Sequence, residues 1–233
     1  MRYLALATDY DGTLVSHDRL SKPTQQALER LRKSGRRVIM VTGRRLADLL
    51  AVCDCTRLFD LIVAENGGVV YDPATRERTC LANKPSERFI EHLRVRGVEP
   101  LEIGQVLLAT QAQHRTTVQD VIWELGLEAQ VIGNRNAVMV LPAGVNKATG
   151  LDYALRELGL SRHEVVGIGD AENDQSFLRH CECAAAVANA AASTREVADI
   201  ITLAENGEGV IELINELIAL AKEKGVFAKG LGL

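Results

Sequence analysis

The stretch Asp9-Tyr-Asp-Gly-Thr13 follows directly on the apolar run Tyr3-Leu-Ala-Leu-Ala-Thr8, and this junction decides the fold class. The apolar run predicts a buried strand, and Gly12 lets the chain turn away sharply at its end. Side chains alternate along a strand, so Asp9 and Asp11 point to the same side. Open α/β sheets carry their chemistry at such carboxyl edges. Two carboxylates this close repel each other, which favours a metal site, an acid/base pair or both.

Two further segments supply groups that suit an anion. A second apolar run, Arg37-Val-Ile-Met-Val-Thr42, ends in Thr42-Gly43-Arg44 and is followed by a helical pattern over residues 45–52. A hydroxyl and a free backbone N–H at a helix start can bind an anion such as phosphate. Further along, Asn146 is suited to cap a helix that Lys147 opens, which places an ammonium group at a similar helix start.

A fourth segment adds oxygen ligands. The run Val165-Val-Gly-Ile-Gly169 predicts a buried strand, and Asp170, Asn173 and Asp174 follow its end. In a parallel sheet these side chains would arrive at the same edge as Asp9.

In this order, the four segments resemble the four motifs of the haloacid dehalogenase superfamily of phosphatases. Three more stretches resemble its Cof-like, type IIB branch, namely Glu65-Asn66-Gly67-Gly68, Gly144-Val-Asn-Lys147 and Val187-Ala-Asn189-Ala190. The resemblance covers nearly the whole chain. It implies an α/β fold in which a Rossmann-like, doubly wound parallel-sheet core carries a small inserted α/β cap domain.

The resemblance also implies a role for each motif residue. Asp9 is implied to attack phosphorus and to become an aspartyl phosphate. Asp11 is implied to act as general acid toward the leaving alcohol and then as general base toward water. Phosphate binding is implied for four residues of the motifs, namely Gly12, Thr42, Gly43 and Lys147.

A Mg²⁺ cofactor is implied as well, because a carboxylate is a poor nucleophile toward an anionic phosphate until charge is neutralised. The implied metal site consists of Asp9, Asp11 through its backbone carbonyl, and Asp170. Asp174 is assigned to the same site, where it would orient Lys147 or a metal-bound water. Asn173 would help to orient Lys147 or the metal-bound water without binding the metal itself, or it would cap a helix.

Strand and helix patterns divide the chain. We predict a discontinuous core over residues 1–74 and 142–222, a cap over 75–141, and a tail or linker over 223–233. Within the core we expect helices over 22–34 and 210–221 and a strand over 61–64, followed by a hairpin-like stretch over 66–73. In the cap we expect helices over 86–96 and 116–125 and strands over 106–109, 129–132 and 137–141.

The last residues, 222–233, are rich in glycine and lose helical periodicity, so we expect a frayed end. They would also suit a linker to a further C-terminal domain. A homodimer is the other partner that the sequence leaves open.

The sequence thus predicts a Mg²⁺-dependent phosphomonoester hydrolase acting on a small phosphorylated metabolite, either a sugar phosphate or phosphoglycolate. No motif in residues 75–139 names the substrate, and the polar turn over 133–136 and the pair His114-Arg115 are weak candidates for reading it. A phosphomutase or phosphotransferase of the phosphomannomutase type is the alternative. A phosphoacceptor signalling domain is disfavoured by the D-x-D-G-T spacing and the inserted cap, and an idle binding module by the intact motifs.

Composition limits the partners and the location. The net charge is −4 and aromatic residues make up 4% of the chain, without a basic patch, so we expect no nucleic-acid partner. No apolar run reaches the length of a membrane span, and the first residues fit a strand instead of a signal peptide, so we expect no membrane association and a cytoplasmic location. The Cys-x-Cys spacings do not suit structural zinc, so we expect reduced cysteines.

Overall fold

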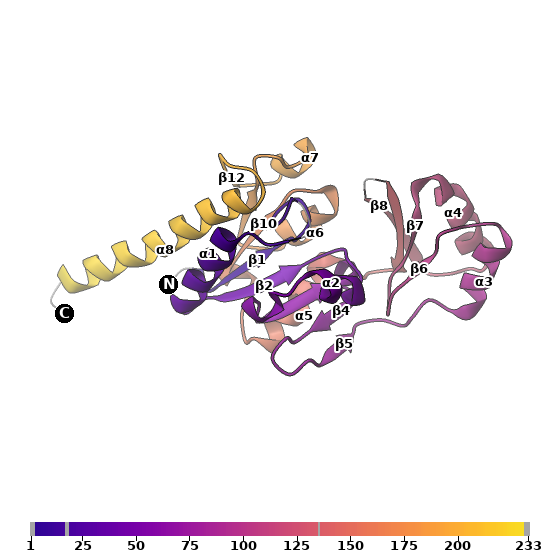
Figure 1. Ribbon diagram of the computed structural model, residues 1–233, viewed down its shortest axis with the longest axis horizontal. Helices are drawn as coiled ribbons and strands as arrows, with labels where there is room; N and C mark the ends of the chain where they lie inside the picture. Colours follow the sequence, from indigo (N-terminus) through magenta and orange to yellow (C-terminus); the bar gives the residue numbers. More distant parts are fainter. Residues whose placement is uncertain (1–2, 17–18, 135, 231–233) are drawn as a thin grey trace.

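The computed structural model describes residues 3–16, 19–134 and 136–230. Its larger sheet has eight strands in the order β12-β11-β10-β1-β2-β3-β4-β5 (Figure 1). Neighbours from β12 to β3 pair in parallel, whereas β4 and β5 are antiparallel. The strands are β1 (Ala5–Thr8), β2 (Arg37–Val41), β3 (Leu61–Ala64), β4 (Val69–Tyr71), β5 (Arg78–Cys80), β10 (Val165–Gly169), β11 (Cys183–Ala186) and β12 (Ile200–Ile201).

Helices cover both faces of this sheet, as predicted for a doubly wound fold. Along β1, Leu6 packs in one apolar cluster with residues of α1, α2 and α8, whereas Ala5 and Ala7 pack in another with residues of α5 and α6. A strand buried on both faces needs an almost continuous apolar sequence, which β1 has. The helices are α1 (Lys22–Lys33), α2 (Leu46–Val52), α5 (Lys147–Glu157), α6 (Gln175–Leu178), α7 (Ala192–Arg195) and α8 (Asn206–Gly230).

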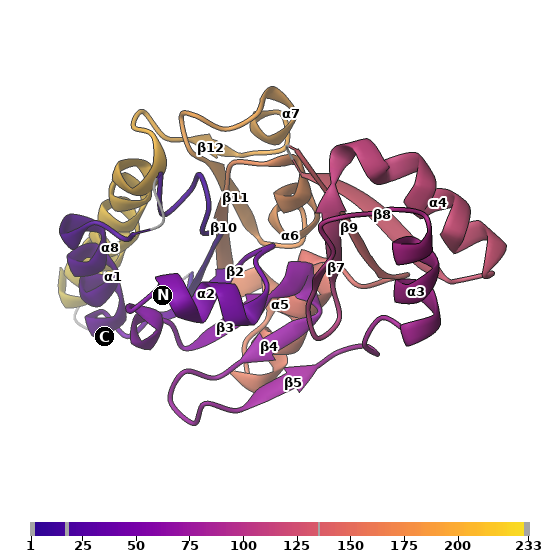
Figure 2. The same ribbon diagram turned by 45° about the vertical axis from the view of Figure 1, so that its right-hand side comes forward.

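A second, four-stranded antiparallel sheet has the order β6-β7-β9-β8. Helices α3 and α4 cover the face of this sheet that points away from the larger sheet (Figures 1 and 2). On the opposite side, Leu107, Ala109 and Met139 belong to a separate apolar cluster. The elements are β6 (Glu102–Ile103), α3 (Glu87–Val95), β7 (Leu108–Gln111), α4 (Arg115–Glu124), β8 (Ala129–Asn134) and β9 (Ala137–Pro142).

The larger sheet extends into the range predicted for the cap. β5 pairs with β4 across a turn in which the Asp72 N–H donates to the Glu77 carbonyl, so the chain leaves the larger sheet only after Cys80. β5 therefore pairs with the larger sheet although its residues fall in the range predicted for the cap. The three exposed residues of β5 carry no hydrophobic alternation that could have indicated a strand. The division into two domains stays a prediction.

The expected frayed end was wrong as far as Gly230, because α8 continues to that residue. Ala221, Lys222, Glu223 and Lys224 are all strong helix formers, and the backbone bonds of a helix are internal to it. Residues 231–233 lie outside the described part of the chain. None of the described helices has an apolar stretch long enough to cross a membrane.

We expect Leu151→Ala to lower the free energy of unfolding by about 2–5 kcal/mol, because the Leu151 side chain in α5 is fully buried against the central strands. Urea denaturation measures this loss. Leu50→Ala is the matched control, since Leu50 in α2 is 41% exposed, and its cost should stay within about 1 kcal/mol. Equal losses in the two variants would contradict the packing described for α5.

Candidate active site

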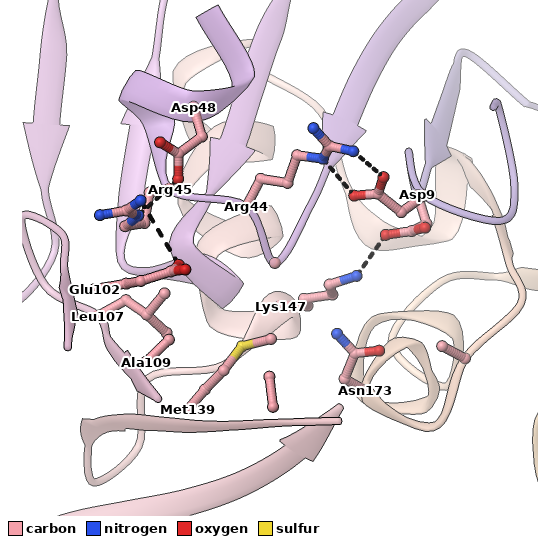
Figure 3. A pocket seen from close by; sticks show the side chains of 14 residues that line it. Asp9, Arg44, Arg45, Asp48, Glu102, Leu107, Ala109, Met139, Lys147 and Asn173 are labelled. Carbon is pink, nitrogen blue, oxygen red and sulfur yellow. Dashed lines mark hydrogen bonds and ion pairs between the residues drawn. The ribbon is translucent and has the colours of Figure 1, made fainter. Parts of the chain in front are cut away.

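The motif residues meet at the carboxyl edge of the central strands. Asp9 follows β1, Thr42 follows β2 and Asp170 follows β10, while Lys147 opens α5. Figure 3 shows the Lys147 side chain pointing toward Asp9. β1 lies between β2 and β10 in the sheet, so three strand ends deliver their side chains to one place.

Lys147 is at the centre of this arrangement. Its ammonium nitrogen Nζ lies 2.6 Å from Asp9 Oδ1 and 2.5 Å from Asp174 Oδ1, and its side chain is 2% exposed. The position of Lys147 follows from the start of α5, where Asn146 accepts hydrogen bonds from the N–H groups of Ala148 and Thr149. This capping box fixes where the helix begins and hence where its first side chain points.

Hydrogen bonds hold the carboxylates of Asp170 and Asp174 in place. The second carboxylate oxygen of Asp174 accepts the N–H groups of Asp170 and Ala171 at 3.0 and 2.8 Å. The Thr13 hydroxyl donates to Asp170 Oδ1 at 2.9 Å. Gly12 has φ of +86°, and a Cβ there would lie 2.3 Å from the Asp170 carboxylate. Gly12 therefore allows the close approach of Asp170, in addition to the turn that the sequence indicated.

The charges in this cluster do not balance. Oxygen atoms of Asp9, Asp170 and Asp174 lie within 4.8 Å of one another, and all three residues are buried. Burial raises the pKa of Asp9 well above its usual range, Asp174 adds repulsion, and Lys147 opposes both. Burial would lower the pKa of Lys147, but Asp174 and Asp9 outweigh it and raise that pKa above its usual range.

Three ionised carboxylates and one ammonium give the cluster a net negative charge, which disfavours ionisation of all three. A divalent cation bound by carboxylate oxygens would remove this imbalance. The three buried carboxylates, Asp9, Asp170 and Asp174, therefore form a donor set that fits a hard divalent cation. The backbone carbonyl of Asp11, assigned to the same metal from the sequence, stays a prediction.

The Asp11 side chain lies against a different partner. Arg44 Nε and Nη2 donate to its two oxygens at 2.8 and 2.6 Å, which is a bidentate ion pair. The Arg44 guanidinium also lies 5.4 Å from the centre of the Tyr10 ring. Both contacts fix the orientation of the Asp11 carboxylate beside Asp9. The sequence placed Arg44 next to the Thr42-Gly43 motif but did not indicate that it binds Asp11.

The remaining motif residues lie around the same centre. Thr42 is buried, and its hydroxyl accepts the Arg44 N–H at 3.1 Å. Gly43 and Asn173 line the cavity above Lys147. The Asn173 amide nitrogen donates to Asn66 Oδ1 at 3.1 Å, so this side chain bridges two loops.

A cavity of about 360 Å³ lies over these groups and extends to the second sheet. At the outer end of the cavity, Arg45 contacts Asp48 at 2.6 Å and Glu102 at 3.6 Å (Figure 3). Because Arg45 directly precedes α2 and Glu102 lies in β6, the second contact connects the two sides of the cavity. The second sheet and its adjoining turn contribute Glu102, Leu107, Ala109, Ala137 and Met139 to the wall.

Sequence reasoning missed these wall residues, because the apolar ones fit a core strand pattern and Glu102 lies in a strand of only two residues. Of the candidates it did consider, His114 and Arg115 are not among the described residues that line the cavity. The His114 ring lies 3.1 Å from the Glu99 carbonyl oxygen instead. In the turn over 133–136, Arg135 lies outside the described residues.

This geometry is that of an α/β enzyme with an acidic cluster at its sheet edge and an antiparallel sheet above it. A model of the haloacid dehalogenase-like hydrolases matches residues 6–103 and 99–214. The chain belongs to this family, as its motifs predicted.

Relatives with assigned names are similar over almost their whole length. A phosphoglycolate phosphatase of Methanothermobacter thermautotrophicus is 30% identical, with 92% of this chain and 98% of the relative covered. A phosphoglycolate phosphatase of Haloarcula marismortui is 32% identical, with 90% and 95% covered.

Solved structures agree on the fold. A haloacid dehalogenase-like hydrolase from Bacteroides thetaiotaomicron gives a TM-score of 0.81 at 22% identity, with 92% of this chain and 99% of that chain covered. A subclass IIB sugar phosphatase gives a TM-score of 0.75 at 20% identity, with 91% and 98% covered.

We expect Asp174→Asn to lower the free energy of unfolding by about 1–3 kcal/mol, because an amide cannot accept from Lys147 with one end and from two backbone N–H groups with the other. Urea denaturation in metal-free buffer measures the loss. Asp152→Asn is the control, since its side chain is 46% exposed, and a change within about 1 kcal/mol is expected there. A loss no larger than that of the control would refute a structural role for the Asp174 carboxylate.

Proposed function

We propose that this protein is a divalent-metal-dependent phosphatase that moves the phosphoryl group of a small phosphorylated metabolite to Asp9 and then to water. The observation that carries the proposal is the buried Asp9–Lys147–Asp174 chain of ion pairs beside Asp170, at the inner end of a cavity. The intact motifs and the family membership support it.

Asp9 is the proposed nucleophile. Asp9 is 4% exposed and lines the cavity, so an attacking oxygen can reach a bound phosphate while bulk water is largely kept away. Lys147 holds Asp9 in place and carries a positive charge that would interact with phosphoryl oxygens. Thr42 and the Gly43 N–H are the proposed further contacts of the phosphate, as the resemblance implies.

Asp11 is the proposed general acid and base. It lines the same cavity, and Arg44 fixes the direction of both carboxylate oxygens. In its protonated form, a carboxyl group at this position can give a proton to the leaving alcohol, and the resulting carboxylate can then take one from the attacking water. The same residue would thereby serve both halves of the reaction.

Asp9 and Asp170 would hold a divalent cation, which would supply charge neutralisation and so reduce the repulsion between the nucleophilic carboxylate and an anionic phosphate. We propose Mg²⁺ as this ion, because the donors are carboxylate oxygens. Asp174 would keep Lys147 in place through their ion pair.

The proposed substrate class comprises phosphoglycolate and small sugar phosphates. The relatives named phosphoglycolate phosphatase and the volume of about 360 Å³ support a small substrate. Arg45, Asp48 and Glu102 at the outer end of the cavity offer charged contacts to the leaving group. A cytoplasmic location stays a prediction, as does a homodimer.

Phosphate release from a panel of phosphoglycolate, sugar phosphates and p-nitrophenyl phosphate tests the proposal. We expect release with Mg²⁺, loss of release with EDTA, and recovery when Mg²⁺ is restored. Asp9→Asn should reduce release to background, because an amide does not form the acyl phosphate. Asp152→Asn should retain full activity.

Retained activity in a folded Asp9→Asn variant would overturn the assignment of the nucleophile. Phosphoryl transfer to a sugar acceptor without phosphate release would assign the alternative, a phosphomutase.

Asp11→Asn should lower kcat about a hundredfold to ten-thousandfold on alkyl phosphates, because their leaving groups need a proton. The loss should be smaller for p-nitrophenyl phosphate, since its leaving group departs without one. Steady-state kinetics on both substrate types measure the difference. A loss of less than tenfold on the alkyl phosphates would move the proton-transfer role to another residue.

A further inference from the structure

The segment Glu65–Gly67 directly after β3 has an unusual backbone. Glu65, Asn66 and Gly67 have φ of +53°, +51° and +99°, so two residues other than glycine adopt the left-handed region. Such strain persists only where surrounding contacts hold it. Two backbone hydrogen bonds hold this segment. The Glu65 N–H donates to the Arg44 carbonyl at 2.9 Å, and the Asn66 N–H donates to the Thr42 carbonyl at 3.1 Å.

The Glu65 side chain reaches from the larger sheet to the turn that precedes β7. Glu65 is 1% exposed, and its carboxylate accepts three backbone N–H groups in a row, from Gln105 at 3.1 Å, Val106 at 2.8 Å and Leu107 at 3.0 Å. A Cβ on Gly104 would lie 2.4 Å from this carboxylate. The turn is thus shaped around a single charged group, which we call the Glu65 clamp.

The neighbouring Asn66 makes a second connection between the same two parts. Its Oδ1 accepts from Asn173 in the motif loop, and its Nδ2 donates to the Met139 sulfur of β9 at 3.0 Å. Leu107 and Met139 both line the cavity over Asp9 and Lys147. Two adjacent side chains therefore tie the cavity wall contributed by the second sheet to the catalytic loops.

We infer that Glu65 is a positioning residue for the reaction. Through the Glu65 clamp it sets the position, relative to Asp9, of the cavity wall that the second sheet contributes. The inference rests on the proposed function for the meaning of the cavity. A role confined to folding would need no link to the wall residue Leu107, whereas the clamp ends on its N–H. Leaving groups that depend on this wall should be the ones affected when the clamp is weakened.

Glu65→Gln tests the clamp with little change in size. The amide nitrogen must face a backbone N–H, since both oxygens of Glu65 act as acceptors. We expect amide hydrogen exchange at residues 105–107 to accelerate at least about tenfold, while exchange in β1 stays unchanged. This readout is independent of catalysis.

Kinetics give the second readout. The best alkyl phosphate of the panel depends on the wall and on proton donation, whereas p-nitrophenyl phosphate has a leaving group that departs unaided. We expect Glu65→Gln to lower kcat/KM for the alkyl phosphate at least about tenfold more than for p-nitrophenyl phosphate. The larger part of the loss should fall on kcat, because a displaced wall affects the alignment of the bound substrate.

Glu212→Gln is the matched control. Glu212 also binds backbone N–H groups through its carboxylate, those of Leu203 and Ala204, in the loop that follows β12. The control loses the same kind of hydrogen bond outside the cavity wall, so the ratio of the two kcat/KM values should not change. Equal ratios in Glu65→Gln and Glu212→Gln would overturn the inference.

Gly104→Ala changes the clamp from its other side and leaves Glu65 intact, which keeps the inference testable where Glu65→Gln does not fold. It should shift the same substrate ratio, because the new methyl group would collide with the carboxylate. An unchanged ratio in a folded Gly104→Ala protein would also refute the inference. Absence of phosphatase activity in the wild-type protein would instead refute the proposed function, and hydrogen exchange would still show whether the clamp exists.

Discussion

The structure depends on one electrostatic constraint, the burial of an ammonium group among three carboxylates at the edge of a parallel sheet. Lys147 is almost inaccessible to water, and Asp9 and Asp174 bind it directly. A lysine in such a place is unfavourable without partners of opposite charge, and each carboxylate is unfavourable without a cation. The order of the strands makes the arrangement possible, because β1 and β10 are neighbours although far apart in sequence.

The part of the site that the sequence predicts well is the part that this topology fixes. Asp9, Thr42 and Asp170 each follow a strand with an almost continuous apolar sequence, so the direction of each strand and the position of its end are well determined. Lys147 follows a recognisable helix cap. For such residues a short motif contains nearly all the information needed to place a side chain.

The part that escaped prediction depends on contacts between distant segments. The sequence identified Glu65 only as part of a family-like stretch, since nothing in residues 104–107 indicates that their N–H groups need an acceptor. β5 and β6 have three and two residues and carry too little pattern to be recognised. The continuation of α8 also escaped prediction, because the glycines after Lys224 disfavour a helix whereas the residues just before them favour one.

The connection between β9 and α5 has a mechanical consequence. β9 ends at Pro142 and α5 begins at Lys147, so residues 143–146 are all that separate the second sheet from the buried ammonium group. Val145 in this connection packs with the apolar residues of the cavity side. A rotation of the second sheet would therefore act on the first turn of α5, and a movement of the cavity wall would shift Lys147. The geometry of the cavity wall and the position of the Lys147 charge are therefore coupled through residues 143–146.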